Sequence, residues 1–155
     1  MLADDSHEFP MTFCAQMEFS GTLDKAAITQ SLAIALERHP LLNSIVRPAK
    51  RNMECWVKNK SVGVEICWQS FGEELQIENG EYIDLKTQPG IQVWIQHDAD
   101  RARITTQFHH ASTDGVGAFQ FLGDWLHIYS ERVGESELQD LPVFEVLPMR
   151  KRFYQ

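Results

Sequence analysis

Two adjacent histidines, an aspartate and a glycine stand close together in the stretch HHASTDG at residues 109–115. Imidazole is the side chain best suited to exchanging protons near neutral pH, and an Asp-Gly pair is typical of a turn. With this composition, chance matches to His-His-x-x-x-Asp-Gly are expected on the order of 10⁻³ times per chain. The stretch therefore predicts a functional site, and its simpler alternative is a strand end followed by a capping aspartate.

The elements around this stretch must position its side chains. Residues 91–97 and 102–110 predict an antiparallel hairpin, with residues 98–101 as its turn. Strand alternation places His110 on one face and His109 on the other, so one ring can enter a cavity while the scaffold holds its neighbour. Asp114 is placed to cap a following helix, and Gly115 would let backbone pass close by.

The rest of the chain predicts a sheet covered by helices. A strand is expected at residues 12–20, a helix within 23–40, three short strands at 43–48, 53–58 and 62–69, a surface connection at 70–90, and a second helix at 116–133. Asp24 would cap the first helix, Pro40 would end it, and His39 reads as a cation at its C-terminus. The second helix carries one apolar stripe, formed by Phe119, Leu122, Leu126, Tyr129 and Val133. These elements predict an α+β sandwich with a mixed, largely antiparallel sheet.

Bulk properties exclude several classes of partner. The 155-residue chain carries a net charge of −8, which argues against nucleic acid or an anionic membrane as the main partner. Its apolar runs are too short for a membrane span, and its acidic start does not resemble a signal peptide. Cys14, Cys55 and Cys67 lie in apolar runs and predict buried, reduced thiols, so we expect a cytoplasmic protein. The basic cluster at residues 149–153 predicts a solvated tail.

The stretch at residues 109–115 and two longer segments resemble a known superfamily. HHASTDG is similar to the HHxxxDG signature of the acyltransferases that include chloramphenicol acetyltransferase, condensation domains of peptide synthetases and wax ester synthases. Residues 21–47, with their Arg-His-x-x-Leu continuation, resemble the first helix of that family, and residues 91–129 resemble its hairpin, signature and following helix in order. The resemblance covers most of residues 12–130 and implies a chloramphenicol acetyltransferase-like two-layer sandwich.

The resemblance also implies roles for individual residues. His110 would be the general base, taking a proton from a hydroxyl or amine as that small-molecule acceptor attacks a thioester carbonyl. His109 and Asp114 would be structural, and Gly115 would leave room for substrate. The thioester would be acyl-CoA or an acyl-phosphopantetheine on a carrier protein, used as a co-substrate, with no bound cofactor and no metal.

Two departures from the family pattern qualify these roles. Many members have an arginine where this chain has Asn43, so Arg38 or Arg47 would have to pair with Asp114. The resemblance also covers only the first half of a condensation-type enzyme. We therefore expect residues 1–134 to form an N-terminal half-domain and residues 135–155 to be a connector toward a second half. A second half-domain or a homo-oligomer would then complete the site.

Three alternatives stay open on the residues alone. A non-catalytic half-domain could act as a binding or assembly module, because an incomplete fold exposes apolar surface. A metal hydrolase could use His109, His110 and Asp114, although adjacent histidines on a strand point apart. A serine hydrolase could use Ser112, which lies in no nucleophile-elbow pattern.

Overall fold

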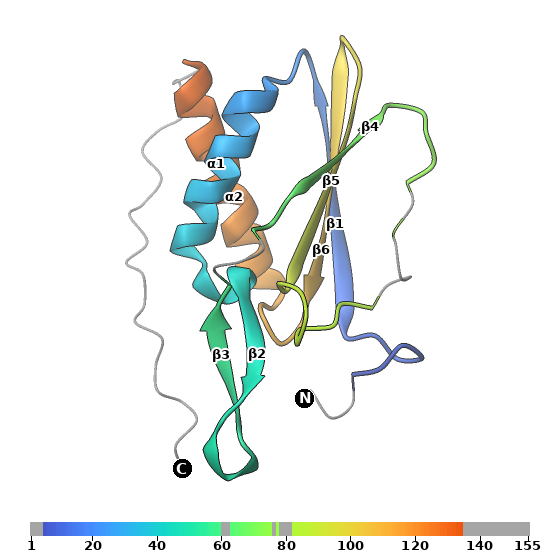
Figure 1. Cartoon of the computed structure of the whole chain (residues 1–155). Coiled ribbons are helices and arrows are strands. Elements are labelled where there is room, and N and C mark those ends of the chain that lie inside the picture. Colours follow the sequence, from blue (N-terminus) through green and yellow to red (C-terminus); the bar gives the residue numbers. More distant parts are fainter. Residues whose placement is uncertain (1–4, 60–62, 76, 78–81, 135–155) are drawn as a thin grey trace.

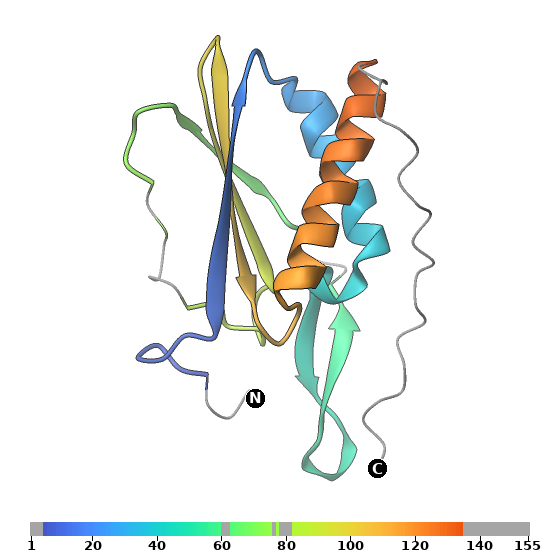
Figure 2. The ribbon, with the colours of Figure 1, turned by 180° about the vertical axis from the view of Figure 1, so that it is seen from behind.

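The computed structural model describes residues 5–59, 63–75, 77 and 82–134 of the chain. These residues form two layers, with both helices packed side by side on one face of a four-stranded sheet (Figure 1). The reverse view shows the same layering, with a separate two-stranded hairpin extending beyond the helix ends (Figure 2). The predicted α+β sandwich is therefore confirmed.

The sheet has the strand order β1-β6-β5-β4. Its strands are β1 (Thr12–Ser20), β6 (Arg101–His109), β5 (Ile91–His97) and β4 (Ile66–Ser70). The two pairs that contain β6 are antiparallel, and β4 pairs with β5 in parallel. This is the mixed, largely antiparallel sheet that the sequence predicts. The register places Thr12 opposite His109, so the start of β1 lies beside the end of β6.

Each helix begins at a predicted aspartate cap. Asp24 accepts the Ala27 N–H at the start of α1 (Lys25–Arg38), and Asp114 accepts the Gly117 N–H at the start of α2 (Gly115–Val133). A capping carboxylate satisfies a backbone donor that the first turn leaves without a partner. Pro40 begins a short 3-10 turn, Pro40–Asn43, so α1 ends before it as expected.

The core lies between the sheet and the helices. Ile104 and Phe108 of β6 pack there with apolar side chains of both helices, and all are nearly inaccessible to water. The predicted stripe on α2 is partly wrong, because Phe119 is 72% exposed. The helix is rotated from that prediction, and its buried apolar side chains are Ala118, Phe121, Leu122 and Trp125. Trp125 decides the rotation, because its indole N–H donates to the Ile28 carbonyl inside the core.

A second, smaller core corrects the prediction for residues 70–90. Ile83 and Leu85 are buried there against Val46 of β2 (Ser44–Pro48), so this segment is not simply a surface connection. The β2 strand pairs with β3 (Glu54–Lys58) to form the separate hairpin, which also carries the 3-10 turn Lys50–Asn52.

The three cysteines also differ from expectation. Cys14, Cys55 and Cys67 are all exposed rather than buried, because each lies on the outward side of its strand. In the described part of the chain, no helix is both long and apolar enough to cross a membrane. The predicted connector at 135–155, with its basic cluster, lies outside the described residues.

Candidate functional site

The motif lies where β6 gives way to α2. His109 is the last residue of β6, and α2 begins at Gly115, so His110 to Asp114 form the turn between them. The Ser112 and Thr113 N–H groups both donate to the His109 carbonyl, at 2.9 and 3.3 Å, which closes this turn. The sequence therefore located the strand-to-helix junction correctly.

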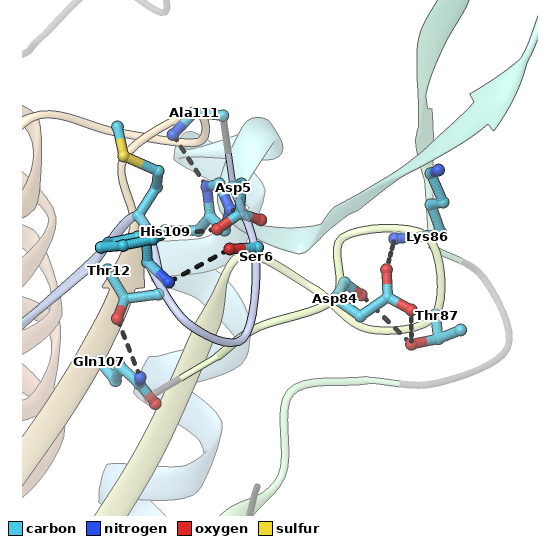
Figure 3. Close-up of polar contacts among 11 residues, drawn as sticks. Asp5, Ser6, Thr12, Asp84, Lys86, Thr87, Gln107, His109 and Ala111 are labelled. Carbon is cyan, nitrogen blue, oxygen red and sulfur yellow. Dashed lines mark hydrogen bonds and ion pairs between the residues drawn. The ribbon is translucent and has the colours of Figure 1, made fainter. Parts of the chain in front are cut away.

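His109 is buried, and both of its ring nitrogens have partners. Its side chain is 1% exposed, and Nε2 lies 2.9 Å from Oδ2 of Asp5 (Figure 3). Nδ1 accepts the Ala111 N–H at 3.0 Å. Such a donor requires an unprotonated Nδ1, so the ring carries its proton on Nε2 and donates it to Asp5. No lone pair of this ring is available to a substrate.

His110 differs from its neighbour in exposure. It is exposed to solvent, and its ring lies 4.6 Å from the Phe13 ring, measured between centroids. Its backbone is fixed, because the His110 N–H donates to the Met11 carbonyl at 2.8 Å. Phe13 itself stacks on Phe108 in the core. The arrangement therefore places an accessible imidazole on a held backbone.

Asp114 caps α2 but lacks the expected arginine. Its Oδ1 accepts the Gly117 N–H at 2.8 Å. Arg38 pairs instead with Asp124 at 3.0 Å, and Arg47 donates to the Lys86 carbonyl at 2.8 Å. Within the described ranges, then, neither arginine forms the predicted ion pair with Asp114. The physical reason is that each guanidinium group already has another acceptor: Asp124 for Arg38, and the Lys86 carbonyl for Arg47.

The glycine that the turn needs is not the one in the motif. A Cβ added at Gly115 would meet no atom within 4 Å. The prediction that another backbone segment passes close to Gly115 is therefore wrong. A Cβ at Gly90 would lie 2.5 Å from Cβ of Ser112 and overlap its hydroxyl. The Gly90 carbonyl also accepts the His109 N–H at 2.9 Å. Gly90 therefore lets the start of β5 approach the motif turn.

A second buried carboxylate lies between the two helices. Asp124 of α2 places Oδ2 3.0 Å from Arg38 Nε and 2.9 Å from His39 Nε2. His39 also meets the edge of the Phe121 ring, with 5.4 Å between centroids. His39 therefore does more than lie at the C-terminus of α1, because its ring joins α1 to α2.

A pocket of about 450 Å³ opens beside Asp5. Its lining includes three carboxylates and consists of Asp5, Val46, Glu54, Tyr82, Asp84, Leu85 and Lys86. Burial raises the pKa of the Tyr82 hydroxyl above its usual 10.0, and the charges of Asp5 and Asp84 add to the rise. Asp84 is occupied by its own loop, since it accepts the Lys86 N–H and the Thr87 hydroxyl (Figure 3).

Sequence reasoning missed three contributors to the site. Asp5 lies 104 positions before His109, and no local pattern links the two. The Met11 carbonyl is a backbone group, which no residue type reveals. Gly90 follows Pro89 and was interpreted as part of a loop. Among the described residues, no group of three or more histidine, cysteine, aspartate or glutamate side chains is arranged to hold a metal ion.

Comparison with known proteins gives matches by structure only. No protein-family model matches the sequence, and no curated protein matches it. Solved structures do match. The SgcC5 protein from Streptomyces globisporus superposes with a TM-score of 0.69 at 16% identity, covering 90% of this chain and 34% of that one. The starter condensation domain of rhizomide synthetase RzmA gives 0.70 at 9% identity, covering 84% and 34%.

A third match is a complex between two proteins. The X-domain in the complex of the X-domain and OxyB from teicoplanin biosynthesis gives a TM-score of 0.67 at 15% identity, covering 89% of this chain and 31% of that one. At such identities the likeness shows the fold, which is that of condensation domains. The chain spans about a third of the length of the solved structures that it matches.

Proposed function

We propose that this chain supplies one wall of an acyltransferase site in which His110 is the general base. The observation that carries the proposal is the contrast within the motif: the His110 ring is accessible, whereas His109 is 1% exposed with both nitrogens occupied. Of the two motif histidines, His110 is the one whose ring is accessible to a substrate. The condensation-domain fold supports acyl transfer as the class of reaction.

The chemistry assigned to His110 is a single proton transfer. The acceptor, a hydroxyl or an amine, attacks the carbonyl carbon of an acyl thioester and gives its proton to the imidazole. The new ester or amide bond forms as the carbon–sulfur bond breaks, and the proton can pass on to the leaving thiolate. A base positioned in this way contributes roughly 10²–10⁴-fold. The donor would be acyl-CoA or an acyl-phosphopantetheine, bound as a co-substrate.

The rest of the motif would act as scaffold. His109 closes the turn with its ring, Asp114 starts α2, and both contacts keep the His110 backbone in place. Gly115 stands at open space, so a role in leaving room for substrate is compatible with its surroundings. Holding both reactants in place would provide much of the remaining acceleration.

Completion of the site would require a second wall. We assign that wall to a second half-domain or to another copy of this chain, because the chain spans about a third of the structures that it matches. Phe119 and Val116, on the first turns of α2, are 72% and 69% exposed beside the motif. Large apolar side chains in such a position are typical of a surface that is covered in an assembly.

A specific observation also favours a second candidate, a binding module without catalysis. One matched structure is the complex of the teicoplanin X-domain with OxyB, in which a protein of this fold binds another protein. On this candidate, the exposed side chains of α2 would bind a partner, and His110 would carry no reaction.

The test is acyl transfer by the full gene product that carries this chain. Acetyl-CoA and acetyl-pantetheine are offered with mixed alcohol and amine acceptors, and products are counted by mass spectrometry, because the exposed cysteines would consume thiol-detecting reagents. His110→Ala is compared with His7→Ala, which removes another exposed histidine. We expect loss of transfer in His110→Ala alone. Turnover that is retained equally in the two variants would refute the proposal. A stable complex of the gene product with a partner protein, without any acyl transfer, would favour the binding module.

A further inference from the structure

The segment before β1 reaches the motif from the far end of the chain. Asp5 is only 6% exposed, and it lies between this segment and the end of β6 (Figure 3). Its Oδ1 accepts the Met11 N–H at 2.9 Å, and its Oδ2 accepts the Nε2 proton of His109 at 2.9 Å. One carboxylate therefore joins two segments whose sequence separation is about a hundred residues.

The two N–H donors, from Met11 and from the His109 ring, each need an acceptor atom at position 5. A carboxylate offers two acceptor oxygens to two N–H donors, whereas an amide offers one oxygen and an NH₂ group. Asparagine at position 5 would leave either Met11 N–H or His109 Nε2–H facing a donor. Loss of a buried partner of this kind costs more than the bond itself contributes, because the remaining group stays desolvated.

The two partners of Asp5, His109 and Met11, each contact the backbone at or next to His110. The ring that Asp5 orients accepts the Ala111 N–H through Nδ1, so it sets the backbone immediately after His110. The residue that Asp5 holds through its N–H, Met11, accepts the His110 N–H through its carbonyl. The two oxygens of Asp5 thus act on both sides of a single residue.

The position of the His110 ring depends on these two constraints. Its ring contact is Phe13, two residues after Met11 on β1, at 4.6 Å between centroids. Movement of Met11 relative to the motif turn would change the distance between the Phe13 and His110 rings. A shift of about 1 Å in a reacting group is enough to lower a rate on the order of a hundredfold.

The geometry points to Asp5 as a positioning residue, which holds His110 in its reactive place through His109 and Met11. This inference rests on the proposed function for its effect on transfer, but the placement of His110 can be measured without any substrate. Asp5 would touch neither the acceptor nor the thioester.

The experiment compares Asp5→Asn with Glu8→Gln, which removes an exposed carboxylate from the same segment. Asp5→Glu serves as a rescue variant, because it keeps both oxygens. In each full-length protein, long-range ¹H–¹⁵N spectra report which nitrogen of His109 carries the proton. Nuclear Overhauser contacts report the distance between the His110 and Phe13 rings, and thioester turnover is measured on the same samples, corrected for the folded fraction.

We expect Asp5→Asn to weaken the His110–Phe13 contact and to lower kcat on the order of tenfold or more, while KM changes less than ~twofold. Asp5→Glu should restore part of kcat, and Glu8→Gln should match the parent protein. An unchanged His110–Phe13 contact in folded Asp5→Asn would overturn the inference, and so would an unchanged kcat. Should His110→Ala retain transfer, the proposed function fails, and the ring contact alone then decides whether Asp5 positions His110.

Discussion

Asp5 and Asp124 each place a nearly buried carboxylate 2.9 Å from a histidine Nε2, but their surroundings differ. Asp124 also binds Arg38, and both of its partners, Arg38 and His39, lie at the C-terminal end of α1, which packs against α2. Asp5 binds a backbone N–H instead, and its histidine stands next to an exposed histidine in a tight turn. One pair joins elements, and the other holds a turn that presents a reactive side chain.

This difference shows that a histidine–carboxylate pair is not by itself a sign of catalysis. His39 and His109 are both hydrogen-bonded to an aspartate, but the first contact joins α1 to α2 and the second holds the motif turn. What distinguishes the motif is the neighbour of the held ring, His110, whose imidazole is exposed. The predictions below test whether the two carboxylates serve packing and positioning respectively.

The largest stability effect is expected at Asp124. Asp124→Ala should lower the free energy of unfolding by about 3 kcal/mol, because Arg38 loses a buried counter-charge and His39 loses a hydrogen-bond partner. The cost stays at the low end of that class, since the Arg38 and His39 side chains are 35% and 21% exposed and can reach water. Urea denaturation measures the change. Transfer per folded molecule should be unaffected, and a specific loss of turnover would erase the distinction between the two pairs.

Gly90→Ala should cost about 2 kcal/mol, because its Cβ would overlap Ser112 and one backbone segment must move. Turnover should fall as well, since the same movement displaces the turn that carries His110. Gly115→Ala is the matched control and should change stability by less than ~0.5 kcal/mol. The reverse order of the two variants in thermal denaturation would show that the motif glycine, not Gly90, governs the turn.

At Asp114 the prediction separates a helix cap from an ion pair. Asp114→Ala should destabilise by about 1 kcal/mol, the usual contribution of an N-cap. Asp114→Asn should be close to neutral, because asparagine also caps well and no arginine loses a partner here. Both are read from urea midpoints at two salt concentrations. A large, salt-sensitive loss in Asp114→Asn would instead reveal the ion pair that the family pattern implied.

The smallest effect concerns Tyr82 at high pH. Since the pKa of its hydroxyl is raised in the folded state, its contribution to stability is complete below pH 10 and is lost as pH rises through the folded pKa. Asp5→Asn should bring this pKa nearer to 10.0, because it removes one of the two charges that raise it. Phenolate absorbance follows the titration, with Tyr82→Phe identifying the signal among three tyrosines. An unchanged titration in Asp5→Asn would contradict the proximity of the two groups.

Local patterns sufficed for much of the fold. Alternation gave the hairpin that ends at His109, and the aspartates at 24 and 114 marked both helix starts, because caps and strand faces depend on neighbouring residues. The rotation of α2 could not be read in this way. Its apolar residues surround more than one face, and the hydrogen bond from Trp125 to Ile28, 97 positions apart, selects which face is buried.

The site was predictable to the same extent and for the same reason. The motif residues were recognised from their spacing, and the different exposure of His109 and His110 followed from the alternation of side chains along a strand. The partners did not, because Asp5, Gly90 and Asp124 come from segments that only the folded sheet and helices bring together. Arg38 was predicted as a possible partner of Asp114 but pairs with Asp124. Sequence spacing cannot tell which of two carboxylates an arginine will contact in the folded chain.

The central claim is that His110 takes the proton during acyl transfer, and its most direct test is the single-turnover rate of His110→Ala with saturating thioester. The account predicts a rate lowered by at least ~10²-fold, the low end for a positioned general base, at an unchanged urea midpoint. It also predicts that His39→Ala keeps its rate per folded molecule. A rate for His110→Ala within about twofold of the parent protein would contradict the account.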